Sequence, residues 1–253
     1  MFTVVTGFFD IGREEWGQYS RSLKDYFKHF KNLLSLRINM VIFIEQKHYD
    51  FVEKSRGDIP CETYIIPTKL EELHMYRYLD TISRIQNLPE YSRDHPNKAA
   101  PEICQPLYTV VTCSKMDMLA RATTIVPKCD YFIWLDAGYT HSTMDLSKME
   151  WNPTQILKIK DKLSVIALQP LSVAKDDPRE FFKQYVDVLI GGFLGGSRDV
   201  VLKIRDMYYE LVVELFKEGL KDDDQFYNTI LAKRHPELFQ VFYSTWYGAM
   251  FLK

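Results

Sequence analysis

Short runs that are apolar at every position alternate along this chain with longer segments in which apolar residues recur every three or four positions. A strand that is apolar on both faces is typical of a sheet covered by other elements on both sides. Runs of this kind occupy residues 2–6, 40–44, 63–66, 131–135, 164–168 and 239–243. We therefore predict strands of one central sheet at these places.

The longer segments predict amphipathic helices. Helical spacing extends over residues 14–34, 70–85, 106–125 and 197–217. The last of these has the clearest pattern, with Ser197 suited to cap its start and Gly219 suited to end it. Strands that alternate with helices indicate an α/β fold with a mainly parallel central sheet flanked by helices.

Residues 87–106 interrupt this alternation. They hold four of the eleven prolines, with Asn, Ser, Asp and His between them, which predicts a long surface excursion. Excursions in α/β enzymes act as lids or substrate loops, or they only decorate the surface, and the pattern does not distinguish these roles. The chain shows no internal repeat, so we predict that residues 1–253 form a single domain.

Composition narrows the class of protein. An apolar fraction of 46% and a charged fraction of 26% are those of an ordinary globular chain, and a net charge of −2 disfavours nucleic acid as a partner. No run approaches the ~20 apolar residues of a membrane-spanning helix, and the first residues do not resemble a signal peptide. The four scattered cysteines (Cys61, Cys104, Cys113, Cys129) predict buried thiols in a reducing compartment. We therefore expect a cytoplasmic protein without a transmembrane segment.

The loop after the first predicted strand contains Gly7, Asp10, Gly12 and Arg13. Ligands of open α/β sheets bind beyond the carboxyl ends of the strands, so this loop is placed to contact a nucleotide. An equally simple interpretation is a glycine-bearing turn whose aspartate caps the next helix. The loop lacks G-x-G-x-x-G and the chain has no G-K-[ST], so neither a dinucleotide-binding motif nor a P-loop is supported.

Asp136 follows the apolar run Y-F-I-W-L, and Gly138 comes two residues later. Burying an unpaired carboxylate is costly, so an aspartate at the end of a wholly apolar strand points to a ligand. It could bind a hard cation or accept hydrogen bonds from ribose or sugar hydroxyls. The alternative is an aspartate that caps the following turn.

Two further segments carry candidate chemistry. Residues 190–197 contain four glycines, including Gly191 and Gly192, which let the backbone pass close to a bound group or pack against its own sheet. The run D-D-D-Q at residues 222–225 holds more carboxylates than one helix cap requires. One of these carboxylates could act as a general base toward a hydroxyl.

Lys115 lies in the predicted helix over residues 106–125, shortly before the strand that leads to Asp136. A lysine in such a helix is most often solvated at the surface, and contact with a diphosphate is the alternative. The six histidines form no H-x-x-H or H-x-x-x-H pair, and the chain has no G-x-S-x-G. The signatures of zinc hydrolases and serine hydrolases are therefore absent.

Four segments together resemble the HtrL/YibB-like family: T-V-V-T-G-F-F-D-I-G-R, Y-F-I-W-L-D-A-G, G-G-F-L-G-G-S and D-D-D-Q-F-Y-N. They follow the family's order and spacing over nearly the whole chain. The first two are specific, whereas the glycine run and D-D-Q recur across several GT-A families. The family is grouped with nucleotide-sugar glycosyltransferases of the GT-A type, so the resemblance implies one α/β domain that binds a nucleotide diphosphosugar.

The resemblance also implies roles for individual residues. The donor would contact Thr6, Gly7, Phe8, Asp10, Arg13, Lys115, Asp136 and Gly138, and the sugar or acceptor would contact Gly191, Gly192 and Gln225. Catalysis would depend on Asp223 and Asp224, which would face the sugar or acceptor hydroxyl.

A divalent cation, Mn²⁺ or Mg²⁺, is the cofactor that the resemblance implies. GT-A enzymes hold it with a D-x-D motif, in which Asp136 would be the first aspartate and the metal ligand. The second position is Gly138 here, so the metal dependence stays open. Either a further ligand would complete the site, or cationic side chains would neutralise the diphosphate. The candidates are His141, His235 and the acidic run in the first case, and Arg13 and Lys115 in the second.

These expectations describe a glycosyltransferase that moves a sugar from a nucleotide-diphosphate donor, by default a UDP-sugar, to a hydroxyl acceptor in polysaccharide or glycoconjugate synthesis. Its partners would be the nucleotide sugar and a glycan or glycoconjugate. A sugar-nucleotide nucleotidyltransferase would share the α/β layout, but residues 3–13 fit its basic, glycine-rich opening loop poorly. The third interpretation is a non-catalytic nucleotide- or glycan-binding module, since the second aspartate of D-x-D is missing.

Overall fold

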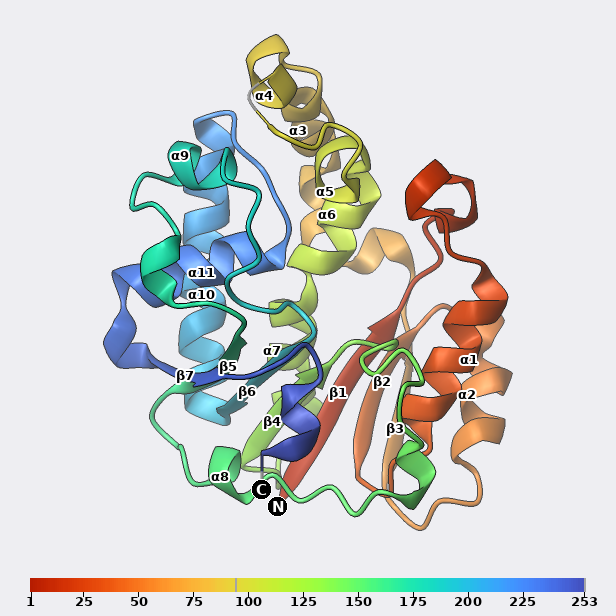
Figure 1. The fold of residues 1–253 in the computed structure, drawn as a ribbon. Coiled ribbons are helices and arrows are strands. Elements are labelled where there is room, and N and C mark those ends of the chain that lie inside the picture. The colour runs from red at the N-terminus through yellow and green to blue at the C-terminus, as the bar shows by residue number, and fades with distance from the viewer. Residues whose placement is uncertain (94, 253) are drawn as a thin grey trace.

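The computed structural model describes residues 1–93 and 95–252, and seven strands of this part of the chain form one sheet (Figure 1). The strands are β1 (Phe2–Phe8), β2 (Met40–Ile44), β3 (Thr63–Pro67), β4 (Tyr131–Leu135), β5 (Leu163–Ala167), β6 (Phe193–Ser197) and β7 (Phe239–Tyr243). Their order in the sheet is β3-β2-β1-β4-β6-β5-β7. β1 and β7 thus belong to the same sheet although they lie near opposite ends of the chain.

The sheet is mainly parallel, as predicted. β3, β2, β1 and β4 run parallel to one another, and β5 runs parallel to β7. The sequence did not predict β6, which lies antiparallel between β4 and β5. In its register Leu135, the last residue of β4, pairs with Phe193, the first residue of β6. The start of β6 therefore lies at the same edge of the sheet as the carboxyl ends of β1 and β4.

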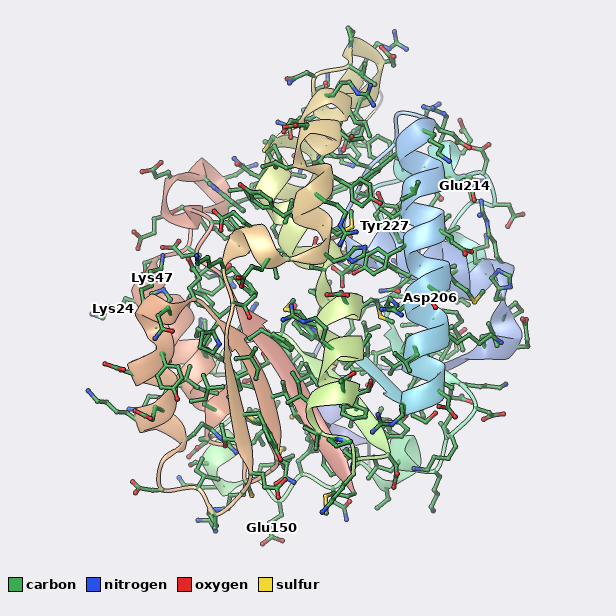
Figure 2. The ribbon with its side chains drawn as sticks, turned by 180° about the vertical axis from the view of Figure 1, so that it is seen from behind. Lys24, Lys47, Glu150, Asp206, Glu214 and Tyr227 are labelled. Atoms are coloured by element: carbon green, nitrogen blue, oxygen red, sulfur yellow. The ribbon has the colours of Figure 1, made fainter. Side chains whose placement is uncertain are left out.

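Both faces of the sheet are buried, which explains the apolar runs. Val4 and Ile133 contribute to the core on the side of α1, whereas Val5 and Trp134 contribute to the core that includes residues of α7 and α10. Figure 2, drawn from behind, shows α10 with the exposed Asp206 and Glu214. The longer helices are α1 (Leu23–Leu34), α2 (Tyr49–Arg56), α3 (Leu79–Gln86), α6 (Pro106–Cys113), α7 (Lys115–Ile125), α10 (Arg198–Lys217) and α11 (Asp224–Arg234). The shorter ones are α4 (Pro89–Arg93), α5 (Pro101–Cys104), α8 (Thr154–Leu157) and α9 (Pro178–Phe182).

Three predicted helices are shorter or broken in the structure. Residues 13–19 form short 3₁₀ turns around Gly17, which has a left-handed φ of 57°, so α1 begins only after Ser22. Residues 70–78 are also mostly 3₁₀, and α3 follows them. The predicted helix over residues 106–125 is interrupted at Ser114, whose hydroxyl donates to the carbonyl of Val110 at 2.7 Å. Lys115 is therefore the first residue of α7.

The predicted excursion at residues 87–106 is less superficial than its composition indicates, because it forms α4 and α5 and buries Tyr91 and Ile103. The Tyr91 hydroxyl donates to the carbonyl of Lys221 at 3.0 Å, which ties the segment to the residues before α11. Asp94 lies outside the described residues. The excursion is thus packed against the body of the protein.

The four cysteines carry free thiols. Cys113 and Cys129 are buried as predicted, whereas Cys61 and Cys104 are partly exposed. Within residues 1–93 and 95–252, no helix combines the length and the apolar character that crossing a membrane requires.

Candidate active site

A cavity of about 570 Å³ lies at the edge of the sheet where β1 and β4 end. Nearly all the residues predicted to contact donor, sugar or acceptor line it. They are Gly7, Phe8, Asp10, Arg13, Lys115, Asp136, Gly138, Gly191, Gly192, Asp223, Asp224 and Gln225. The fold therefore gathers segments from both ends of the chain at the place where open α/β sheets bind their ligands.

Thr6 is the exception among the predicted donor residues. It pairs with Ile42 inside the sheet, it is fully buried, and it is not part of the cavity lining. The reason is that β1 does not end at Thr6, as its apolar pattern indicated, but continues to Phe8. The structure thus places Thr6 in the sheet and not at the site.

Asp136 reaches the cavity because it directly follows β4. Its backbone N–H donates to the carbonyl of Gly192 at 3.1 Å, which continues the antiparallel pairing of β4 with β6. The Trp134 indole Nε1 donates to Asp136 Oδ1 at 2.7 Å and fixes the carboxylate. The Asp136 side chain remains 40% exposed, so it is available to a ligand.

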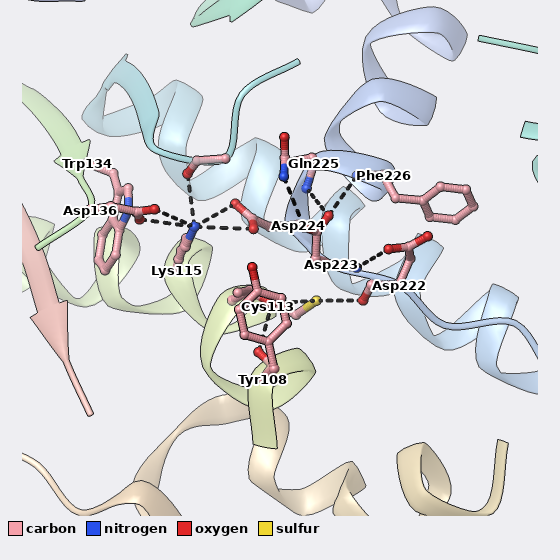
Figure 3. Close-up of polar contacts among 12 residues, drawn as sticks. Tyr108, Cys113, Lys115, Trp134, Asp136, Asp222, Asp223, Asp224, Gln225 and Phe226 are labelled. Atoms are coloured by element: carbon pink, nitrogen blue, oxygen red, sulfur yellow. Dashed lines mark hydrogen bonds and ion pairs between the residues drawn. The ribbon is translucent and has the colours of Figure 1, made fainter. Parts of the chain in front are cut away.

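Lys115 is buried between two carboxylates, and the surface interpretation of this residue is wrong. Its Nζ lies 3.0 Å from Asp136 Oδ1 and 3.1 Å from Asp224 Oδ2, and it donates to the carbonyl of Gly191 at 3.0 Å (Figure 3). The side chains of Lys115 and Asp224 are only 8% and 3% exposed. The ammonium therefore joins β4, the start of β6 and α11 at the floor of the cavity.

The neighbours of Lys115 stabilise its protonated form. Burial alone would lower the pKa of the ammonium, but the nearby carboxylates of Asp136 and Asp224 raise this pKa above its usual value. Lys115 is therefore charged throughout the physiological pH range. Asp136 and Asp224 compensate this charge, so an anionic ligand would share the ammonium with the partly exposed Asp136.

Gly191 allows the carboxylate of Asp224 to approach this cluster. A Cβ added at Gly191 would lie 2.7 Å from Asp224 Oδ2 and 2.9 Å from Asp224 Oδ1, distances that real Cβ atoms do not show. Gly138 is different, because a Cβ there would be no closer than 3.7 Å to its surroundings. The glycine at position 191 is thus required by close packing, whereas the glycine at position 138 is not.

The acidic run divides its roles among three residues. Asp223 caps α11 by accepting from the backbone N–H of Gln225 at 3.0 Å and of Phe226 at 3.4 Å, so the helix-cap interpretation holds for this residue. The side-chain amide of Gln225 also donates to Asp223 Oδ2 at 3.0 Å. Asp224 instead pairs with Lys115, and Asp222 accepts from the backbone N–H of Asp223 at 2.7 Å. Burial raises the pKa of Asp223, which makes it a better proton acceptor than an exposed aspartate.

Arg13, in the opening loop, is a further cation that lines the cavity. Arg13 donates from Nε to the carbonyl of Tyr19 at 3.1 Å and from Nη1 to the Tyr26 hydroxyl at 2.7 Å. Its guanidinium also lies over the rings of Tyr26 and Tyr108. Asp10 accepts from the backbone N–H of Gly12 at 3.1 Å and so makes a local turn, while it also lines the cavity. It caps no helix, because the 3₁₀ turn at Arg13–Glu15 has no side-chain cap and α1 is capped by Ser22.

Several lining residues gave no signal in the sequence. They are aromatic or basic side chains whose segments meet only in the fold: Arg21, Tyr26, Tyr108, Trp134, Tyr139, Trp246 and Tyr247. Trp134 is the one that sequence reasoning could have found, because it stands two residues before Asp136 in an apolar run. Trp246 and Tyr247 follow the last strand and carry no motif.

The residues present fit a bound divalent cation poorly. Within the described part of the chain, no group of three or more His, Cys, Asp or Glu side chains is gathered so that it could hold a metal ion. Lys115 already faces the Asp136 carboxylate and would repel a second cation there. His141 contacts Arg21 and Tyr247, and His235 does not line the cavity. The cation implied by the resemblance therefore stays a prediction, and the donor set favours the other alternative, neutralisation by cationic side chains.

The carboxyl groups around Asp223 predict an unusual pH dependence of stability. Burial and the negative charge of Asp223 raise the pKa of Glu102 on α5 to about 7, against the opposing ammonium of Lys221. Between pH ~4, the ordinary pKa of glutamate, and the folded pKa, Glu102 therefore holds a proton in the folded protein but not in the unfolded chain. This contribution is complete below pH ~4 and is lost as the pH rises through the folded pKa.

We expect the free energy of unfolding to fall between about pH 5 and about pH 7.5, and Glu102→Gln to remove on the order of 1–3 kcal/mol of that fall. Urea unfolding at a series of pH values measures it. Glu90→Gln, an exposed glutamate on α4, is the matched control and should keep the wild-type slope. A slope that is the same in wild type and Glu102→Gln would show that this carboxyl group titrates normally.

Comparison with known proteins gives a family and a relative for this chain. A family model described as "Bacterial protein of unknown function (HtrL_YibB)" matches residues 1–252. Protein HtrL of Escherichia coli (strain K12) is 27% identical over 268 residues, which cover 95% of this chain and 87% of that protein.

Two glycosyltransferases are among the solved structures that match this chain. The apo form of mouse xyloside xylosyltransferase 1 has a TM-score of 0.50 at 12% identity, covering 95% of this chain and 84% of that chain. A glycosyltransferase involved in the glycosylation of the major capsid of PBCV-1 has a TM-score of 0.40 at 11% identity, covering 95% and 80%. The likeness to the xylosyltransferase confirms the expected GT-A-like fold, and at 12% identity it concerns the fold alone.

Proposed function

We propose that this chain, which belongs to the HtrL_YibB family, is a glycosyltransferase that moves a sugar from a nucleotide-diphosphate donor, by default a UDP-sugar, to a hydroxyl of a glycan or glycoconjugate. The observation that carries the proposal is the buried Lys115 ammonium, held between Asp136 and Asp224 at the floor of the cavity. A site with one convergent cationic centre and aromatic walls fits a ligand that has both a diphosphate and flat rings.

In this proposal the leaving group is stabilised by the chain's own cations. As the bond between the anomeric carbon and the diphosphate oxygen breaks, its electron pair stays on the diphosphate. Lys115 and Arg13 both line the cavity and face that growing negative charge. A preorganised cation in a site shielded from water stabilises such charge more strongly than it would in solution. This is the alternative to the Mn²⁺ or Mg²⁺ that the resemblance implies.

The two aspartates beside Lys115 have different roles in the proposal. Asp224 is nearly inaccessible and orients the ammonium, whereas Asp136 is partly exposed. Asp136 both holds Lys115 and accepts a hydrogen bond from a ribose or sugar hydroxyl of the donor. The opening loop, with Phe8 and Asp10 in the lining, lies where the nucleotide base and ribose are expected.

Asp223 is the proposed general base. It lines the cavity without pairing with Lys115, and its Oδ2 has the Gln225 amide as a partner. When the acceptor oxygen bonds to the anomeric carbon, its hydroxyl proton passes to the Asp223 carboxylate. The diphosphate departs with the electron pair of the broken bond, so charge and protons balance.

The decisive experiment incubates the protein with a panel of nucleotide sugars and follows nucleoside diphosphate release, with Mn²⁺ and with a chelator. We expect slow release with one donor, about equal in both conditions because Lys115 supplies the charge. Asp136→Ala should abolish the release, since the donor loses a hydroxyl contact and Lys115 loses its partner. Asp206→Ala, an exposed aspartate on α10, should release diphosphate at the wild-type rate.

The other functions predict different products in the same assay. Release of inorganic pyrophosphate from a sugar phosphate and a nucleoside triphosphate would indicate the nucleotidyltransferase. Tight nucleotide binding without turnover, even when glycan acceptors are added, would indicate a binding module. Nucleoside diphosphate release that requires Mn²⁺ would indicate that a metal ion, and not Lys115, stabilises the leaving diphosphate.

A further inference from the structure

A second cavity of about 220 Å³ adjoins the first. Arg13, Tyr108, Asp223 and Gln225 line both cavities, so the two meet at the proposed general base. Pockets for drug-sized ligands have volumes of ~300–1,000 Å³. The second cavity is smaller and has the scale of a single sugar ring.

The excursion that interrupts the strand–helix alternation forms one wall of this cavity, through His95, Pro101 and Glu102. Another wall comes from residues 181–188, which follow the start of α9, and a third comes from residues 222–229 at the start of α11. Figure 1 shows α5, α9 and α11 on the same side of the sheet as the carboxyl ends of its central strands. The excursion thus contributes to a cavity beside the reaction centre.

The walls of the second cavity are predominantly acidic. The charged side chains that line it are Arg13, at the boundary with the first cavity, and Glu102, Asp187, Asp222 and Asp223. Burial and the charge of Asp223 raise the pKa of Asp187, and burial lowers the pKa of His95, which keeps that imidazole neutral. The nearby Lys221 ammonium donates to the carbonyls of Glu102 and Ile103. Burial and the charge of Asp223 also raise the pKa of Asp222 well above its usual value, so these crowded carboxyl groups keep protons near neutral pH. Any further negative charge here is therefore unfavourable, whereas the carboxyl oxygens can exchange hydrogen bonds with hydroxyls.

Flat aromatic surfaces complete the cavity. Its lining includes the rings of Tyr19, Tyr108, Phe181, Phe182, Tyr185 and Phe226. Tyr185 has a left-handed φ of 47°, which is strained for a bulky residue and is found mainly where function fixes the backbone. The Asn97 amide of the excursion donates to the Tyr185 hydroxyl at 2.9 Å and holds this ring in place.

One polar atom at the junction of the cavities still requires a donor. Gln225 Oε1 is buried and has no hydrogen-bond partner among the described residues, while its amide nitrogen donates to Asp223. A buried carbonyl oxygen without a partner costs about 1–3 kcal/mol. A hydroxyl of a ligand in the second cavity would satisfy it, close to the carboxylate that would take the proton.

We infer that the second cavity binds the acceptor as a single terminal sugar ring that carries no negative charge, with its hydroxyls toward the carboxylates and its apolar face toward the aromatic rings. The role of this sugar as the acceptor rests on the proposed function. The existence of the binding site and its preference for uncharged sugars do not. A uronic acid or a phosphorylated sugar is excluded by the acidic walls.

The test compares three matched methyl glycosides in both the glucose and galactose series: the neutral sugar, the 2-amino sugar and the uronic acid. Saturation-transfer NMR on the full chain measures binding without any need for turnover. We expect the neutral and amino sugars to bind about tenfold or more tightly than the uronic acid, because like charges in contact are strongly unfavourable.

Two sets of variants assign this binding to the second cavity. Glu102→Gln combined with Asp187→Asn should make the uronic acid bind more nearly as well as the neutral sugar. We expect the logarithm of the ratio of their dissociation constants to fall by at least half. Tyr185→Ala should weaken all three sugars alike and leave UDP binding unchanged. Asp206→Ala should change neither measurement.

The inference is overturned if the uronic acid binds as well as the neutral sugar, if the charge variants leave the preference unchanged, or if neither series binds. The inference is supported if the neutral and amino sugars bind more tightly than the uronic acid and if Tyr185→Ala weakens the binding of all three. If that binding is observed but no nucleotide sugar releases diphosphate in its presence, the proposed transferase function fails and the sugar site stands.

Discussion

Replacing Lys115 with methionine is expected to slow nucleoside diphosphate release by about 10²–10³-fold, the loss typical when one group that stabilises developing charge is removed. Methionine keeps an unbranched side chain but leaves Asp136 and Asp224 without their ammonium. The folded state should therefore also lose about 3–5 kcal/mol, because a buried carboxylate becomes uncompensated. A coupled diphosphate assay and urea unfolding at the same pH measure the two effects.

Two further variants separate charge compensation from catalysis. Lys115→Met combined with Asp224→Asn removes both members of one ion pair, so it should recover part of the stability without recovering the rate. Lys203→Met, an exposed lysine on α10, should change neither quantity. A Lys115→Met protein that releases diphosphate at the wild-type rate would contradict the role given to this ammonium.

Asp223→Asn should lower the turnover number for sugar transfer by about 10²–10⁴-fold, the contribution usual for a general base. Asparagine is as good an N-cap as aspartate, so α11 should keep its start and the protein its stability. Binding of UDP, measured by calorimetry, should change little because the diphosphate contacts lie with Lys115 and Arg13. The comparison of turnover with UDP affinity therefore isolates the chemical step.

Asp177 provides the matched control for this substitution. It caps α9 in the same way, accepting from the backbone N–H of Arg179 at 2.8 Å and of Glu180 at 3.0 Å, but it lines neither cavity. Asp177→Asn should therefore leave turnover unchanged. If Asp223→Asn behaves like Asp177→Asn, Asp223 is only a helix cap and another group accepts the proton.

The strands were predictable where burial on both faces leaves a wholly apolar run. β2, β4 and β7 have the same bounds in the sequence pattern and in the structure. β6 was missed because its sequence F-L-G-G-S contains two glycines, which favour neither strand nor any other regular element. It becomes a strand by pairing with β4 and β5, which a local pattern does not reveal.

The candidate site was predictable to the extent that single residues break a local pattern. Asp136 stands out because a carboxylate ends an apolar run. Lys115 does not stand out, because the carboxylates that keep it buried lie 21 and 109 residues away along the chain. Its position also depends on the interruption of the helix at Ser114, whose hydroxyl contacts are long-range as well as local.

The excursion at residues 87–106 lies between α3 and α6. Its described residues, 87–93 and 95–106, add no strand to the sheet and do not line the first cavity. It can be exchanged only together with its packing partners, because Tyr91 is buried and donates to the carbonyl of Lys221. Grafting the corresponding segment of a relative into this chain would be a way to redirect it toward another glycan, while the machinery that cleaves the donor is inherited intact. Diversity of products within such a scaffold would then arise by insertion and replacement at one locus.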